Sequence, residues 1–164
     1  MRNLAKVLSV VTLVTGVAAA WPANSASLSQ GRAAFLHGNY LLAARLLAPL
    51  ANRGNPRAQA MLGFQYENGF GVPQDYDIAF RLYCGAAERG DPTGQYLLGL
   101  SYDKGHGVER DDVLAYKWLD LAAAAAPPRD RENYLRIRNA VASKMSLNQV
   151  TEGQRLAVNW RPRP

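Results

Sequence analysis

The sequence predicts an all-α fold, an α/α solenoid of about four antiparallel helix hairpins. The main observation is an internal repeat: with Pro56 set against Pro92, twelve of 36 positions carry the same residue. Each repeat holds two stretches with apolar residues at helical spacing. No stretch alternates as a β-strand does. The other identical pairs are Gln59–Gln95, Leu62–Leu98, Gly63–Gly99, Tyr66–Tyr102, Gly69–Gly105, Gly71–Gly107, Val72–Val108, Asp75–Asp111, Ala79–Ala115, Ala86–Ala122 and Ala87–Ala123.

A shorter unit over residues 27–55 is predicted to form a degenerate first hairpin. Ala43, Ala51 and Gly54 fall 36 residues before alanines and a glycine of the next unit. The two predicted helices are joined by the tight sequence "HGNY" at 37–40, which lacks the glycine-x-glycine-valine insertion of the later units. We therefore expect a short turn at this position.

The two full units are predicted over residues 56–91 and 92–127. In the first unit, Asn55 and Pro56 are residues that cap and open a helix, and Gly69 can end that helix in the left-handed conformation. Asp75 is the expected N-cap of the second helix. The second unit repeats these signals 36 residues later, so both units are expected to be helical hairpins.

Residues 128–164 are predicted to form two C-terminal capping helices. The prolines Pro127 and Pro128 break the chain after the second unit. The last helix has the signature of a capping box, because Ser146 is followed three residues later by Gln149.

Residues 1–26 are predicted to be a signal peptide. Arg2 and Lys6 precede an apolar run over 7–20, and small residues suited to cleavage follow near 20–26. The run of roughly 14 apolar residues is shorter than the ~20 that cross a bilayer. We therefore expect a periplasmic or secreted protein that meets the membrane only transiently through its leader, with an uncleaved anchor as the alternative.

The charge pattern argues against a nucleic-acid partner. The formal net charge is +6, and loss of the two basic residues of the leader would reduce it to +4. The basic residues are scattered, and no five of them are consecutive. Cys84 is the single cysteine and cannot form an internal disulfide. We expect a monomer rather than a dimer linked through Cys84.

The repeated pattern "A..LG..Y..G.GV..D...A......AA..G" resembles the Sel1-like repeat, a relative of the tetratricopeptide repeat. The resemblance covers about residues 29 to 160, and the second unit departs from it at Ala126, where a glycine is usual. Residues 27–55 look more like a tetratricopeptide hairpin, and the C-terminal helix is similar to one that closes exported bacterial members. The matching positions are Leu62, Gly63, Tyr66, Gly69, Gly71, Val72, Asp75, Ala79, Ala86, Ala87 and Gly90, and the same positions 36 residues later through Ala123.

This resemblance implies a small right-handed solenoid that acts by binding proteins. Members of the family are mostly adaptors, and exported bacterial ones include envelope regulators, scaffolds and host-interaction factors. Stacked hairpins also present an extended surface that suits a peptide segment better than a small substrate.

The sequence "GFGVPQD" at 69–75 raises the possibility of a phosphate-binding loop. Such a loop follows a strand and carries a lysine and a hydroxyl residue after its last glycine, whereas here Val72 and Pro73 follow. The loop recurs as "GHGVERD" at 105–111. It is therefore predicted to be a structural joint between helices, and no cofactor site is expected.

No catalytic or metal site is expected either. His37 and His106 are predicted to be exposed residues of two separate turns, with no second ligand at metal-binding spacing. Ser101 lacks the second glycine of a nucleophile elbow and is predicted to be a surface or groove residue. Paired carboxylates such as Asp75 and Asp77 stand at helix starts, where they favour the helix dipole.

A partner-binding groove is predicted on the face of the first helices that does not carry the Leu-Gly-Tyr packing residues. Apolar and aromatic side chains there would form an interface core, with basic side chains at its rim. The alternative is that the C-terminal helices fold over this face and make it ordinary core. The predicted groove residues are Arg32, Phe35, Arg57, Phe64, Asn68, Tyr96, Leu100 and Lys104, with Ala60, Glu67, Thr93 and Asp103 on the same face.

The leading functional hypothesis is a non-enzymatic periplasmic or secreted interaction module, an adaptor, scaffold or regulator of an envelope process. Its groove would hold a segment of another envelope protein. The alternative is a cell-wall-associated enzyme or binder acting on peptidoglycan or a β-lactam.

Overall fold

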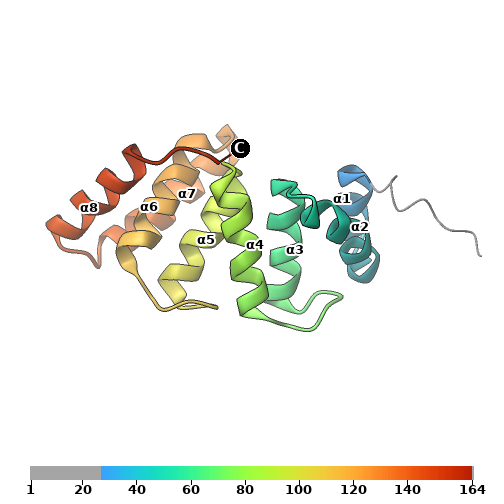
Figure 1. Ribbon diagram of the computed structural model, residues 1–164. Coiled ribbons are helices and arrows are strands. Elements are labelled where there is room, and N and C mark those ends of the chain that lie inside the picture. Colours follow the sequence, from blue (N-terminus) through green and yellow to red (C-terminus); the bar gives the residue numbers. More distant parts are fainter. Residues whose placement is uncertain (1–26, 164) are drawn as a thin grey trace, which may run out of the picture.

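The computed structural model describes residues 27–163, which form eight α-helices and no strand, as the sequence predicts (Figure 1). The predicted signal peptide lies outside the described residues. No helix within 27–163 is long and apolar enough to span a bilayer. The helices are α1 (Leu28–Leu36), α2 (Tyr40–Asn52), α3 (Pro56–Asn68), α4 (Tyr76–Glu88), α5 (Pro92–Lys104), α6 (Asp112–Ala125), α7 (Pro128–Ala142) and α8 (Leu147–Val158).

The helix boundaries follow the capping signals of the sequence. The side chains of Asn55 and Asp75 accept hydrogen bonds from backbone amides of the first turns of α3 and α4, at 2.9 and 2.8 Å. Gly69 ends α3 in the left-handed conformation, with φ of 70°. Ser146 and Gln149 form the predicted capping box of α8. These local predictions are confirmed.

The helices stack as a solenoid in which each packs on its neighbours along the chain (Figure 1). Alanines at the helix contacts, such as Ala79, Ala86 and Ala115, are almost fully buried and let the backbones approach closely. Larger side chains such as Tyr83 and Leu119 fill the remaining space. At the C-terminal end α7 and α8 both pack mainly against α6 rather than on each other.

The loops 69–75 and 105–111 join each unit to the one before it. The backbone of Gly71 lies so close to Tyr40 that a Cβ atom would overlap the Tyr40 carbonyl group, and Gly107 meets Tyr76 in the same way. Both glycines have positive φ, 71° and 70°. Glycine is required at these two positions because the approach leaves no space for a side chain and the conformation disfavours one.

An aromatic contact accompanies each of these backbone contacts. The ring of Phe70 stacks on Tyr40 with centroids 4.6 Å apart, and His106, 36 residues later, lies 4.4 Å from Tyr76. Gln65 adds hydrogen bonds from its amide to the carbonyls of Tyr40 (2.8 Å) and Phe70 (3.1 Å). The glycine loops are therefore joints between units, as their recurrence predicts.

The segment after α8 returns across the end of the solenoid to α4 (Figure 1). Trp160 packs edge-to-face on Trp118 with centroids 6.0 Å apart. The backbone amide of Arg163 donates to the Glu88 carbonyl at 2.7 Å, and its guanidinium lies 2.8 Å from the Glu88 carboxylate. This segment links α8 to helices of both full units, and we call residues 160–163 the C-terminal strap.

We predict that Gly107→Ala destabilises the protein more than Gly38→Ala. Both glycines have a φ of 70 to 75°, but a Cβ at Gly38 meets nothing within 4 Å whereas one at Gly107 overlaps the backbone of Tyr76. The control Gly38→Ala should cost ~1–2 kcal/mol from its backbone conformation, and Gly107→Ala a further ~1–3 kcal/mol from the overlap. Urea unfolding followed by circular dichroism measures both. Equal losses would contradict the role of Gly107 as a joint.

We also predict that Trp160→Ala lowers the free energy of unfolding by ~1–3 kcal/mol, because the substitution removes a partly buried ring from Trp118. Leu147→Ala is the control, since this side chain is 81% exposed and should change stability by less than about 0.5 kcal/mol. Both are measured by guanidinium unfolding. A Trp160→Ala variant as stable as the control would show that the C-terminal strap contributes nothing to the fold.

Candidate protein-binding groove

An apolar hollow of about 300 Å³ lies between the first helices of successive units. One turn near the end of α1, the middle of α3, the first half of α5 and one residue of α7 line it. Its walls present almost no polar surface. The lining residues are Phe35, Ala60, Met61, Phe64, Thr93, Tyr96, Leu97 and Tyr134.

Aromatic rings define two sides of this groove. Phe35 of α1 meets Phe64 of α3 edge-to-face, with centroids 6.0 Å apart. On the other side Tyr96 of α5 stacks on Tyr134 of α7 at 4.2 Å, with the rings nearly parallel. Burial raises the pKa of the Tyr134 phenol, although a hydrogen bond with the Thr93 side chain opposes that rise. The phenol is therefore neutral at physiological pH.

The groove remains open although α7 reaches it. Phe35, Phe64 and Tyr96 are all partly exposed. α7 packs mainly against α6 and contributes Tyr134 as a wall, and it does not cover α1 or α3. Of the two arrangements considered for the C-terminal helices, the structure has the one in which they border the predicted face. Sequence periodicity gave no sign that Tyr134 would reach α5.

The other predicted groove residues lie around this hollow or beyond it. Arg57 stands at its edge, where its guanidinium donates to Thr93 at 2.9 Å and lies 3.6 Å from Asp91. Arg32 is exposed on α1. Leu100 is partly buried and packs on the cluster that contains Trp118 instead of lining the hollow.

Two predicted residues lie at the far ends of their helices. Asn68 is exposed and donates from its side-chain amide to the carbonyl of Phe64, so it helps to end α3. Lys104 is exposed in the last turn of α5 and forms no ion pair with any residue in 27–163. Neither side chain lines the hollow.

Glu67 is not a free groove residue, because it joins two units. One carboxylate oxygen accepts from the Tyr83 hydroxyl at 2.7 Å, and the other lies 3.3 Å from Nδ1 of His106. Burial, reinforced by the charge of Glu67, raises the pKa of Tyr83. The prediction of a freely exposed turn is wrong for His106, whose side chain is only 33% exposed. His37 is exposed as predicted.

Ser101 is also placed differently from the prediction. It is 2% exposed, and its hydroxyl donates to the Leu97 carbonyl one turn earlier in α5. It lies on the buried face because the first helices of the middle units pack on both sides. Its hydroxyl is therefore satisfied within its own helix.

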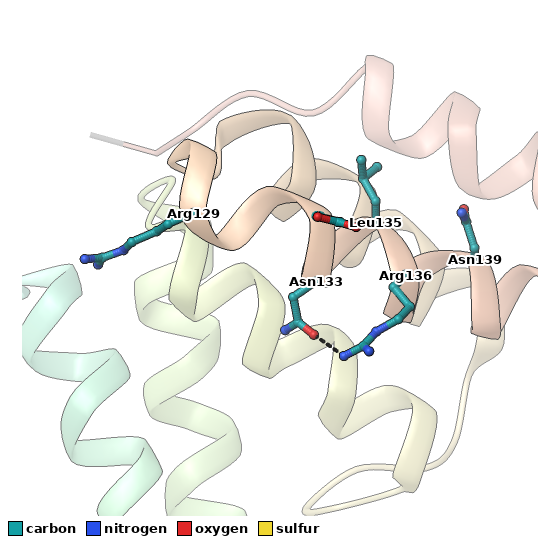
Figure 2. Close-up of a pocket in the computed structure, with 6 residues that line it drawn as sticks. Arg129, Asn133, Leu135, Arg136 and Asn139 are labelled. Atoms are coloured by element: carbon teal, nitrogen blue, oxygen red, sulfur yellow. Dashed lines mark hydrogen bonds between the residues drawn. The ribbon is translucent and has the colours of Figure 1, made fainter.

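A second hollow, of about 560 Å³, runs along α7 beside the groove (Figure 2). Its residues recur at helical spacing on the outer face of α7, next to the face that carries Tyr134. Figure 2 shows Asn133 and Arg136 joined by a hydrogen bond of 2.7 Å. The sequence analysis did not single out this surface. The lining residues are Arg129, Glu132, Asn133, Leu135, Arg136 and Asn139.

Within residues 27–163 no group of three histidine, cysteine or acidic side chains is placed to hold a metal ion. Cys84 lies on α4, partly buried in the cluster around Trp118. Burial raises the pKa of its thiol to about 11, and the nearby Glu88 carboxylate adds to this rise. The thiol is therefore protonated at physiological pH.

The fold and groove define the class of this protein as an α-helical repeat solenoid of the kind that generally serves as a protein-interaction scaffold. The Sel1 repeat model matches residues 56–91 and 92–126. With the structural neighbours described next, these matches show that the chain belongs to the Sel1-like repeat family.

Two crystal structures are similar to this chain. One is a protective antigen of uropathogenic Escherichia coli strains with an SLR fold, at 29% identity and a TM-score of 0.73 over 80% of this chain. The other is a Sel1 repeat protein from Oxalobacter formigenes, at 27% identity and a TM-score of 0.63 over 81% of this chain. The chain spans 28% of the first protein and 53% of the second. Comparison with curated protein sequences gave no significant match.

We predict that Cys84 reacts slowly with iodoacetamide in the folded protein. Because its pKa is raised to about 11, the thiolate fraction and the alkylation rate should rise about tenfold per pH unit from pH 8 to pH 10 without levelling. In guanidinium the rate should instead level near the ordinary thiol pKa of ~8.5. Mass spectrometry of quenched samples follows the rate. A plateau below pH 9 in the folded protein would contradict the predicted burial.

Proposed function

We propose that the protein is a non-enzymatic interaction module, exported to the periplasm or secreted, that holds a segment of another envelope protein in the groove between α1, α3, α5 and α7. The observation that carries this proposal is the open apolar hollow bordered by Phe35, Phe64 and Tyr96. An accessible aromatic hollow of this kind matches the centre of protein interfaces, where a few large side chains carry most of the binding energy.

Three features support the individual parts of this proposal. Sel1 repeats generally mediate protein–protein interactions, which favours a protein partner. The groove runs across successive helices, so an extended or helical segment can lie along it. The basic and apolar pattern of residues 1–26 supports export.

A site-specific photo-crosslinking experiment tests the groove. Benzoyl-phenylalanine placed at Phe64 should form a discrete adduct with one envelope protein in living cells. The same group at Leu147, which is exposed on α8 outside the groove, should not form that adduct. Adding Tyr96→Ala to the Phe64 variant should abolish the adduct, because it removes a wall of the hollow while α7 still packs on α6.

The partner segment identified from the adduct is then measured directly by fluorescence anisotropy. Phe64→Ala should weaken its binding by about 30-fold or more, the effect expected of a residue worth at least ~2 kcal/mol. Leu147→Ala should leave the affinity unchanged. Identical adducts from both positions, or an unchanged affinity for Phe64→Ala, would contradict binding in the groove.

A further inference from the structure

The two hollows described above meet along α7. Tyr134 is a wall of the apolar groove, and its neighbour Asn133 lines the polar hollow together with Arg136 one turn later. Neighbouring residues of an extended peptide are about 3.3 Å apart along its axis. A bound segment can therefore place one side chain in the groove and the next few residues over the polar hollow.

The polar hollow is rich in hydrogen-bond donors. Asn133 uses its side-chain oxygen to accept from Arg136, and its amide nitrogen has no hydrogen-bond acceptor among residues 27–163. Arg136 pairs with no carboxylate in the same part of the chain. Its guanidinium thus keeps donors for a ligand while Asn133 holds it in place.

The other arginines of α7 differ from Arg136 in what they contact. Arg138 is paired with Asp120 at 2.6 Å, and Arg131 donates to the carbonyl of Ala126. Arg129 lies 3.3 Å from the carboxylate of its neighbour Asp130, is 77% exposed, and extends away from α7 in Figure 2. The positive charge that remains available beside the groove is therefore concentrated in Arg136, with Arg129 at the edge.

We propose that the segment bound in the groove carries one large apolar side chain followed closely by a carboxylate, and that Asn133 and Arg136 bind this carboxylate. Charge complementarity carries this choice, since a guanidinium held by an amide presents the donor pair that carboxylate groups accept best. This inference rests on the groove function proposed above and adds the chemistry of its partner. Glu132, which lines the same hollow, opposes the binding and gives the test a variant of opposite sign.

Three short labelled peptides test this inference by fluorescence anisotropy with the purified protein. The first has one phenylalanine followed by two glutamates, the second has glutamines in place of the glutamates, and the third has alanine in place of the phenylalanine. The first should bind about tenfold more tightly than the second, the gain expected from one charged hydrogen-bonded pair at a partly exposed site. The third should bind more weakly than the first.

Exposed single substitutions assign the effect to α7. Arg136→Gln should reduce the affinity for the glutamate peptide to that for the glutamine peptide and leave the latter unchanged. Glu132→Gln should increase the affinity for the glutamate peptide. Arg81→Gln is the matched control, because Arg81 is exposed on α4 and lines neither hollow, and it should change nothing.

The outcomes separate this inference from the function on which it rests. Equal binding of the glutamate and glutamine peptides, with the phenylalanine preference retained, would overturn the carboxylate site alone. Equal losses from Arg136→Gln and Arg81→Gln would overturn it as well. Loss of the phenylalanine preference would contradict the groove function, and failure of all three peptides to bind would contradict both.

Discussion

The close backbone contact between each long loop and the preceding unit sets how the helices of this protein stack. Gly71 lies against Tyr40, and Gly107 lies against Tyr76, at positions where a side chain would overlap the backbone. A rigid contact of this kind fixes the distance between consecutive units more sharply than apolar packing, which is not directional. Because both loops make the same contact, α3 and α5 are placed by the same rule, and the groove lies between them.

The sequence predicts the parts of the fold that depend on local chemistry. Capping by Asn55, termination by Gly69 and the capping box at Ser146 involve residues within one helical turn, so short-range patterns specify them. The place of α7 could not be predicted in the same way. Its packing on α6 and the stacking of Tyr134 on Tyr96 join residues that are distant in sequence and lie outside the 36-residue repeat.

Polar residues at equivalent repeat positions show the same limit. Glu67 and Asp103 lie 36 residues apart, and periodicity places both on one helix face. In the structure Glu67 contacts Tyr83 and His106, whereas Asp103 pairs with Lys144 from the turn before α8 at 2.8 Å. Periodicity gives the direction of a side chain, but the neighbouring unit supplies its partner, and the neighbours of the two residues differ.

The groove arises where the repeat is least regular. Ala60 and Tyr96 occupy equivalent positions of α3 and α5, and so do Phe64 and Leu100. The small side chain of Ala60 leaves space beside Phe64, while Tyr96 is held against Tyr134 on the opposite side. A perfectly regular solenoid would offer the same site at every unit and let a ligand bind in several registers. The exchange of large and small side chains instead creates a single apolar hollow beside Arg136, which gives a bound segment one register.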